Sequence, residues 1–304
     1  MKHRIDSFDF IFLSYDEPNA EILYAQATNL IPWIKRVHGV KGFDTAHIAC
    51  ADSSETDFFV TIDGDNEIYP NFLEIELDIN ENQSNHAWTW AGRNSVNGLV
   101  YGNGGLKLWS KEFVRSMKSH ENAEDPRKAV EFCWDNKYHE VQGCYSTSHI
   151  NASEQQAWRS GFREGVKMCL ERGAVVSTGD FHKKIWYGNI NRLCIWCSIG
   201  SDVENGLWAM YGARLGVYHT MIENNDHTVI SNYETMQDLW KSVKDNDPGT
   251  ECERLEPILR SKIGLDICMM RPEESKFFKR VYMNPPRPWM ANDVIDHFMA
   301  FKHV

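Results

Sequence analysis

Short apolar runs alternate with helix-like segments in the first part of the chain. The runs at residues 8–13 and 58–62 consist mainly of aromatic and aliphatic residues, which is typical of buried strands. Residues 20–30 and 45–52 have helical character, and Asp44 is a suitable N-cap for the second segment. This alternation predicts parallel strands joined by crossover helices. We therefore expect the chain to begin as an α/β domain.

Polar side chains follow these strands at the points where they leave the core. Tyr15 and Asp16 lie in the loop after the first strand, and Lys41 lies in a glycine-punctuated turn. Asp63 and Asp65 follow the run at residues 58–62 directly. Ligands of open α/β sheets bind outside the carboxyl ends of the strands, and paired carboxylates there suit a hard divalent cation that also binds phosphate oxygens. The sequence therefore predicts a metal–diphosphate site in a nucleotide pocket.

The middle of the chain predicts further strands and one long helix. Residues 88–91 and 142–150 favour strands, and residues 153–171 favour a helix that Ser153 caps. That helix contains Gly161 and Gly165, each of which costs about 1 kcal/mol, so we expect close packing or a ligand there.

Two cysteines mark another apolar segment, at residues 192–199. Cys194 and Cys197 form a lone CxxC without a second pair of ligands, so we expect both to lie in a strand.

The composition changes after residue 224. Residues 231–256 are acidic, whereas residues 271–304 are rich in proline, basic and aromatic residues. We expect residues 1–224 to form an α/β domain with a mostly parallel, Rossmann-like sheet flanked by helices. Residues 225–304 are expected to form a helical C-terminal appendage packed on it.

Composition and charge narrow the class of protein. No apolar run approaches the roughly 18 residues of a membrane helix, and the eight cysteines are scattered as is usual for reduced thiols. We therefore expect a cytoplasmic protein that does not associate with a membrane. The net charge of −11 argues against a generic nucleic-acid binder. However, residues 51–81 hold ten acidic and no basic residues, and residues 159–192 hold seven basic against three acidic. Solvated helix faces would explain both regions without any function. The alternative is that cations collect near the first region and a polyanion binds at the second.

Asp63-Gly64-Asp65 admits several interpretations. An ordinary strand-ending turn needs no function, because Asp-Gly is a common turn pair. A calcium loop of the EF-hand type would need glycine at its sixth position, where Ile68 stands. A phosphatase of the haloacid-dehalogenase type usually has small hydroxyl residues after its aspartates, whereas Asn66 and Glu67 follow here.

The form and position of the two aspartates resemble the Asp-x-Asp of GT-A type glycosyltransferases. Further stretches resemble a family of such enzymes in T-even-like bacteriophages, over about residues 8–230. The stretches that carry this resemblance are residues 38–47, 62–66, 145–151, 158–168 and 211–216. Members of the family are thought to transfer sugars, arabinose among them, to hydroxylated cytosines of phage DNA.

This resemblance implies a role for each residue on the donor side. The donor would be a nucleotide-sugar, most simply a UDP-sugar. Asp65 would ligate Mn²⁺ or Mg²⁺, and Asp63 would contact the metal or the ribose. Tyr15 and Asp16 would contact the nucleobase or ribose, and Lys41 would approach the diphosphate. GT-A enzymes often add a later histidine to the metal shell. His219 fits this place, with His149 as the alternative.

On the acceptor side, the resemblance implies an acidic catalytic base and a DNA partner. Glu164 is the candidate base, and Arg159 and Arg163 beside it would bind the diphosphate or a DNA phosphate. Double-stranded phage DNA would be the acceptor, held in part by Lys279, Arg280 and Arg287, and no protein partner is inferred. Two alternatives stay open: transfer to a glycan or lipopolysaccharide, and a non-catalytic protein that binds sugar nucleotides or nucleic acid.

Overall fold

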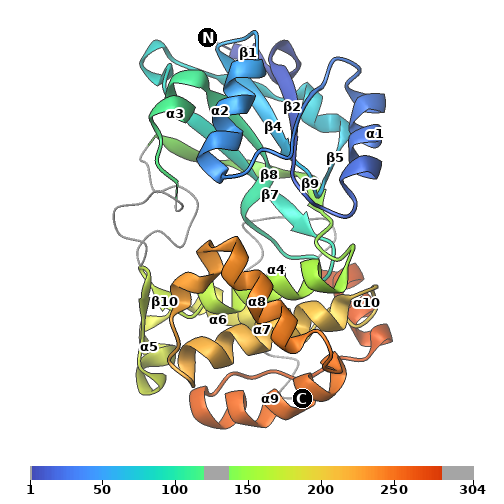
Figure 1. Ribbon diagram of the computed structural model, residues 1–304, viewed down its shortest axis with the longest axis vertical. Coiled ribbons are helices and arrows are strands. Elements are labelled where there is room, and N and C mark those ends of the chain that lie inside the picture. The colour runs from blue at the N-terminus through green and yellow to red at the C-terminus, as the bar shows by residue number, and fades with distance from the viewer. Residues whose placement is uncertain (1, 120–136, 283–304) are drawn as a thin grey trace.

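A computed structural model of the chain describes residues 2–119 and 137–282. An α/β body built on a central sheet lies above a body made mostly of helices (Figure 1). The sheet has seven strands in the order β3-β2-β4-β8-β7-β9-β5. Their bounds are β2 Asp9–Ser14, β3 Lys35–His38, β4 Phe58–Asp63, β5 Asn66–Ile68, β7 Ala87–Asn94, β8 Val100–Ser110 and β9 Tyr138–Ser148. Two small two-stranded sheets pair β1 (Lys2–Arg4) with β6 (Glu76–Asp78) and β10 (Leu170–Glu171) with β11 (Ala174–Val175).

The central sheet is mixed, although most of its strands run the same way. β2 is parallel to both β3 and β4, and β7 is parallel to β9. β8 is antiparallel to its neighbours β4 and β7, and β5 is antiparallel to β9. The expected Rossmann-like α/β arrangement is therefore confirmed in its first three strands, and the later strands give the sheet its mixed character.

Helices on both faces explain why the middle of β2 is apolar at successive positions. Phe10 and Phe12 of β2 pack in one cluster with α1 (Ala20–Leu30), while Ile11 between them packs with α2 (Phe43–Ser53) on the other face. Strand side chains alternate between faces, so a strand covered on both sides loses its polar positions. The helix α3 (Lys111–Ser116) covers the same face as α2, and the Ser110 hydroxyl caps it by accepting from the Phe113 N–H at 3.0 Å.

The helical body is centred on two helices, α4 and α7. Its helices are α4 Glu154–Lys167, α5 Phe181–Lys184, α6 Tyr187–Trp196, α7 Gly206–Met221, α8 Tyr233–Val243, α9 Pro248–Ile263 and α10 Pro272–Tyr282. A Cβ at Gly161 or Gly165 of α4 would lie 2.0 or 2.3 Å from the backbone of α7, and a Cβ at Gly212 or Gly216 of α7 would lie 2.2 or 2.3 Å from the backbone of α4. Close backbone packing therefore explains the two glycines inside α4.

Three local expectations differ from the structure. Asp44 is not the N-cap of α2, because that helix begins at Phe43 with Gly42 as its N-cap, so Asp44 lies in the first turn. Cys194 and Cys197 do not lie in a strand: Cys194 is buried in α6, and Cys197 is the C-cap of that helix. An apolar run of this length suits a buried helix as well as a strand, and all-round burial removes the period that would separate them. The capped helix also ends at Lys167 rather than near residue 171, because the chain turns into β10.

The division of the chain at residue 224 stays a prediction. Helices α8, α9 and α10 do follow it, but their buried side chains Met236, Leu255 and Phe278 share one cluster with Trp158 and Phe162 of α4. None of the helices in residues 2–119 and 137–282 is long and apolar enough to cross a membrane.

Candidate functional site

The carboxyl ends of β2, β3 and β4 meet at one edge of the sheet. Leu13 is paired with both Val37 and Asp63, and Ser14 is paired with His38. The Ser14 hydroxyl lies 3.0 Å from Nδ1 of His38, which ties the first two loops together. The three polar loops that the sequence places after these strands therefore do converge.

Gly64 lets the loop after β2 approach the two aspartates. A Cβ at Gly64 would lie 2.6 Å from Oε2 of Glu17 and 2.9 Å from Cβ of Ser14. The same Glu17 oxygen accepts a hydrogen bond of 2.8 Å from the Tyr15 N–H, which holds the carboxylate over the turn. Glu17 thus joins the aspartates as a third acidic side chain beside the turn.

Negative charge is concentrated here and only partly neutralised. The ammonium group of Lys107, on β8, is buried and donates to Oδ2 of Asp63 at 2.9 Å. The Asn66 amide donates to Oδ1 of Asp65 at 2.7 Å. Burial, followed by the carboxylates of Asp63 and Glu17, raises the pKa of Asp65 to about 6, although Asn66 and a nearby arginine oppose this. A bound cation would relieve the repulsion that raises this pKa.

The two aspartates suit a hard divalent cation. One oxygen of each accepts the hydrogen bond described above, and no residue in the described ranges pairs with the other. In residues 2–119 and 137–282, no three His, Cys, Asp or Glu side chains gather as a ligand set. The protein would therefore supply two carboxylates, and phosphate oxygens and water would complete the shell, as is usual for Mg²⁺.

Helix α8 of the helical body reaches this edge of the sheet. The Tyr233 hydroxyl donates to the Asp16 carboxylate, and the ring meets Tyr15 edge-on at 6.3 Å between centroids. The guanidinium of Arg159, on α4, lies 5.4 Å from the centre of the Tyr233 ring. Arg159 is also the arginine that lowers the pKa of Asp65. These contacts bring Arg159 to the group formed by Tyr15, Asp16 and the two aspartates.

Lys41 reaches α8 by a different contact. Its ammonium group lies 3.3 Å from a carboxylate oxygen of Glu234, and both side chains are about four-fifths exposed. An ion pair so exposed contributes little to stability, so Lys41 can exchange this partner for a ligand.

Glu164 does not join this group. It accepts from the hydroxyl of Tyr101, on β8, and pairs with Lys167, and it makes contact neither with the two aspartates nor with Tyr15. Burial alone would raise the pKa of Glu164, but Lys167 and the hydrogen bond from Tyr101 outweigh it and hold that pKa below its ordinary value. Five residues along a helix turn the side chain by about 140°, so Glu164 faces away from Arg159. Its role as the base stays a prediction that these contacts do not support.

Arg163 and His219 are engaged within the helical body. A guanidinium nitrogen of Arg163 donates to the Ile230 carbonyl. His219 is buried on α7 with its ring edge-on to Phe162, and its Nε2 lies 3.3 Å from the Asp226 carbonyl oxygen. Neither side chain is assembled with Asp63 and Asp65, so their expected roles rest on the resemblance alone.

His149, the alternative histidine, lies beside the aspartates. Its backbone N–H donates to the Asp65 carbonyl at 2.7 Å, while its ring Nε2 lies 2.8 Å from Oε2 of Glu67. The imidazole therefore pairs with Glu67, two residues beyond Asp65, rather than with Asp65 itself.

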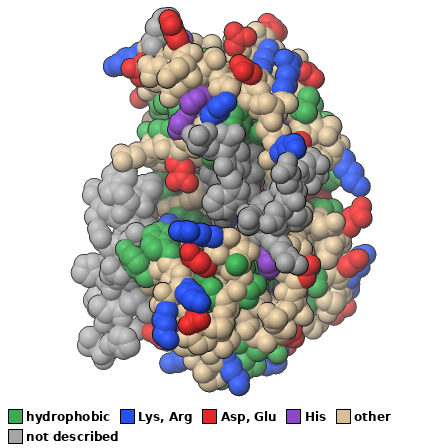
Figure 2. Space-filling view, turned by 90° about the vertical axis from the view of Figure 1, so that its left-hand side faces the viewer, with side chains coloured by type: hydrophobic (Ala, Val, Ile, Leu, Met, Phe, Trp, Pro, Cys, Tyr) green, Lys and Arg blue, Asp and Glu red, His purple; other side chains and the backbone are tan. Residues whose placement is uncertain are grey.

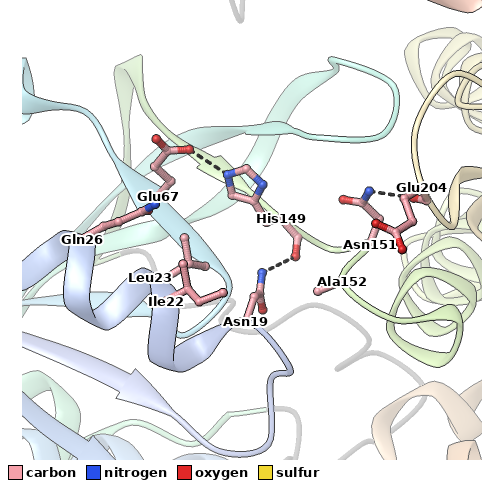
Figure 3. Close-up of a pocket in the computed structure, with 9 residues that line it drawn as sticks. All are labelled: Asn19, Ile22, Leu23, Gln26, Glu67, His149, Asn151, Ala152 and Glu204. Atoms are coloured by element: carbon pink, nitrogen blue, oxygen red, sulfur yellow. Dashed lines mark hydrogen bonds and ion pairs between the residues drawn. The ribbon is translucent and has the colours of Figure 1, made fainter.

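A pocket, which we call the α1–β9 pocket, lies between α1 and the chain that follows β9 (Figure 3). It has a volume of about 290 Å³. Its polar lining comprises Asn19, Gln26, Glu67, His149, Asn151 and Glu204. No spacing in the sequence indicates it, because its residues come from four separate segments.

The charged side chains on one face of the molecule are mixed. In Figure 2, basic and acidic side chains are scattered over both bodies wherever the surface is described. Of the C-terminal basic residues, Lys279 pairs with Asp202 at 2.8 Å, Arg280 lies over the Phe277 ring at 5.7 Å, and Arg287 is outside the described residues.

Comparisons with known proteins add little to this geometry. No protein-family model matches the chain, and a search of curated proteins returned no match. Among solved structures, a putative glucose-1-phosphate thymidylyltransferase from Bacillus anthracis, in complex with a sucrose, is similar at 14% identity and a TM-score of 0.28. That alignment covers 47% of this chain and 72% of the other. At such a TM-score it supports no conclusion about fold or function.

Proposed function

We propose that this protein is a metal-dependent glycosyltransferase that uses a nucleotide-sugar, most simply a UDP-sugar. The observation that carries the proposal is the pair Asp63 and Asp65 at the carboxyl end of β4, with the pKa of Asp65 raised to about 6 by burial and neighbouring carboxylates. Such a pair favours a divalent cation, and the cation in turn favours a diphosphate.

Each neighbouring side chain has a task in this reaction. Asp63 and Asp65 hold Mn²⁺ or Mg²⁺, and Lys107 fixes the orientation of Asp63. When bound, the cation supplies Lewis-acid stabilisation of the diphosphate leaving group. Tyr15 offers a ring to the nucleobase, and the Asp16 carboxylate accepts from a ribose hydroxyl.

The positive charges near the site act on the phosphates. Arg159, beside Tyr233, faces the leaving group as it gains charge. Lys41 releases Glu234 and pairs with the diphosphate.

For the acceptor, we propose a hydroxylated cytosine of phage DNA, as the resemblance implies. The excess of basic over acidic residues within residues 159–192 supports a polyanionic partner in a chain whose net charge is −11, although Arg163 and Lys167 are engaged inside the helical body. Transfer to a glycan is the alternative, because charges of both signs are mixed over the face shown in Figure 2.

The test is turnover of a panel of nucleotide-sugars with Mn²⁺, followed by chromatography of the released nucleotide. Asp65→Ala is expected to reduce turnover at least about 100-fold, because it removes a ligand of the charge-stabilising cation. Glu81→Ala, an exposed acidic residue of the same acidic segment, is the matched control and should keep wild-type turnover.

Two outcomes would contradict parts of this proposal. A wild-type protein that binds UDP but turns over no donor would favour the non-catalytic alternative. In the transfer assay, the acceptors are plain DNA, DNA with hydroxymethylated cytosine and a glycan. Transfer to the glycan alone would exclude DNA as the acceptor.

A further inference from the structure

The walls of the α1–β9 pocket are held in place by hydrogen bonds. The Asn19 amide donates to the His149 carbonyl at 3.0 Å, which joins α1 to the end of β9. Asn151 donates to the Glu204 carbonyl at 2.8 Å and accepts from the Ser95 hydroxyl at 2.7 Å. These hydrogen bonds fix the segments that form the walls, so the pocket is preformed.

The lining of the pocket suits a small ring with hydroxyl groups. Ile22, Leu23 and Ala152 provide apolar surface, while carboxylates, amides and an imidazole provide the polar groups (Figure 3). A volume of about 290 Å³ is at the lower limit for ligand pockets, which is enough for one monosaccharide or one modified base.

The imidazole of His149 has a defined orientation in this pocket. Its Nε2 lies 2.8 Å from a carboxylate oxygen of Glu67, and a carboxylate can only accept, so Nε2–H donates. In a neutral imidazole with this tautomer, Nδ1 is the nitrogen that carries the lone pair. The two ring nitrogens point in different directions, and no side chain in the described ranges pairs with Nδ1. A histidine oriented by a carboxylate in this way is suited to accept a proton.

The pocket adjoins the candidate metal site through a shared segment. Asp65 and Glu67 are two residues apart, and the His149 N–H donates to the Asp65 carbonyl at 2.7 Å. Asn66 links the metal site to the end of β9, because it donates to the Asp65 carboxylate and accepts from the Ser148 hydroxyl at 3.0 Å. A ligand in the pocket would thus lie next to a donor bound at the aspartates.

We propose that the α1–β9 pocket binds the hydroxyl-bearing ring of the acceptor and that His149 is the base of the transfer reaction. This inference rests on the proposed glycosyltransferase function. The acceptor O–H gives its proton to Nδ1 of His149, and the oxygen forms a bond to the anomeric carbon. The bond between that carbon and the diphosphate oxygen breaks, and the nucleoside diphosphate leaves with the electron pair. Glu67 is a positioning residue that stabilises the resulting imidazolium.

The pocket is tested first without a donor. Protein with ¹⁵N-labelled histidine is titrated with 5-hydroxymethyl-2′-deoxycytidine in one arm and with methyl glycosides in another. Assignment comes from the His149→Gln spectrum. A shift of the His149 signals in either arm supports the pocket and identifies the source of the hydroxyl. Unchanged His149 signals in both arms would overturn it.

The base is tested by kinetics with the acceptor that binds. His149→Gln should lower kcat at least about 100-fold and leave the Kd for UDP with Mn²⁺ unchanged. Glu67→Gln should also lower kcat without changing the donor KM, because a neutral amide does not stabilise the imidazolium that forms when His149 takes the proton. His182→Gln, an exposed histidine on α5, is the matched control.

The outcomes separate this inference from the proposed function. A His149→Gln variant that binds UDP and keeps kcat within threefold would exclude His149 as the base while the glycosyltransferase function stands. Shifted His149 signals in a wild-type protein without donor turnover would keep the pocket and exclude the transferase.

Discussion

Individual residues at the site differ in how far the sequence predicts them. Asp63 and Asp65 could be placed at a strand end because the apolar run before them is local and ends sharply. Glu17 and Lys107 could not, since their approach depends on strand register and on the missing side chain of Gly64. The charge of the site is therefore set by tertiary contacts, although its two central carboxylates are visible in the sequence.

His47 provides a titration that can be measured at the residue scale. The ring is buried, stacks on Phe43 at 4.1 Å and lies edge-on to Trp109. Burial lowers the pKa of His47 to about 4. The pKa of His47 in the folded protein lies below the value of about 6.5 in the unfolded chain. The contribution of neutral His47 to the free energy of unfolding is therefore fully present above pH 6.5 and is lost as the pH falls toward 4.

Between pH 7.5 and 4.5, His47 should cost the protein about 2–3 kcal/mol of unfolding free energy. His47→Leu should lack this part of the decrease, as measured by urea unfolding at the two pH values. His182→Gln, whose histidine is exposed, should follow the wild type. Equal decreases in the wild type and in His47→Leu would contradict the prediction.

At the scale of elements, the strands were easier to predict than the helical body. The alternation of strands and helices in residues 8–63 follows a local period, and the structure has it. The segment at residues 192–199 has no such period, because α6 is buried on nearly every side and its apolar residues match a strand equally well. The sequence indicates that Gly161 and Gly165 are unfavourable in an isolated helix. It does not indicate that the backbone of α7 packs against them.

Gly161→Ala reverses the usual effect of this substitution in a helix. In an exposed helix it would stabilise by about 1 kcal/mol. Here the new Cβ would lie 2.0 Å from the Ala209 carbonyl oxygen, so we expect a loss of about 1–3 kcal/mol or more. Thermal or chemical unfolding measures it. Gly179→Ala, which meets no atom within 4 Å, should change stability by less than about 0.5 kcal/mol. A neutral Gly161→Ala would refute close packing.

At the scale of the whole molecule, the candidate site lies where the two bodies meet. Tyr233 and Asp16 are 217 residues apart in the sequence, yet they share a hydrogen bond. Nothing local in either segment indicates this meeting, so the part played by α8 in the site could not be predicted. A ligand that contacts both bodies would stabilise their arrangement as well as fill the site.

Tyr233→Ala tests this bridge. The ring contacts Tyr15 and Arg159, so its loss should weaken the Kd for UDP with Mn²⁺ by about tenfold, or roughly 1.4 kcal/mol. Calorimetric titration measures it. The matched control is Tyr187→Ala, since Tyr187 is about half exposed on α6 and lies outside the site. Equal affinities in the two variants would separate α8 from donor binding.

The four glycines between α4 and α7 also limit how this protein can evolve. Glycine is the only amino acid without a Cβ, so every single-nucleotide change that replaces a glycine codon with another amino acid adds an atom where the partner backbone already lies. Saturation libraries at Gly161, Gly165, Gly212 and Gly216 should therefore be enriched in glycine, with alanine as the least destabilising replacement. Lineages that share this fold can alter the interface only by moving the two helices apart, which requires several coordinated substitutions.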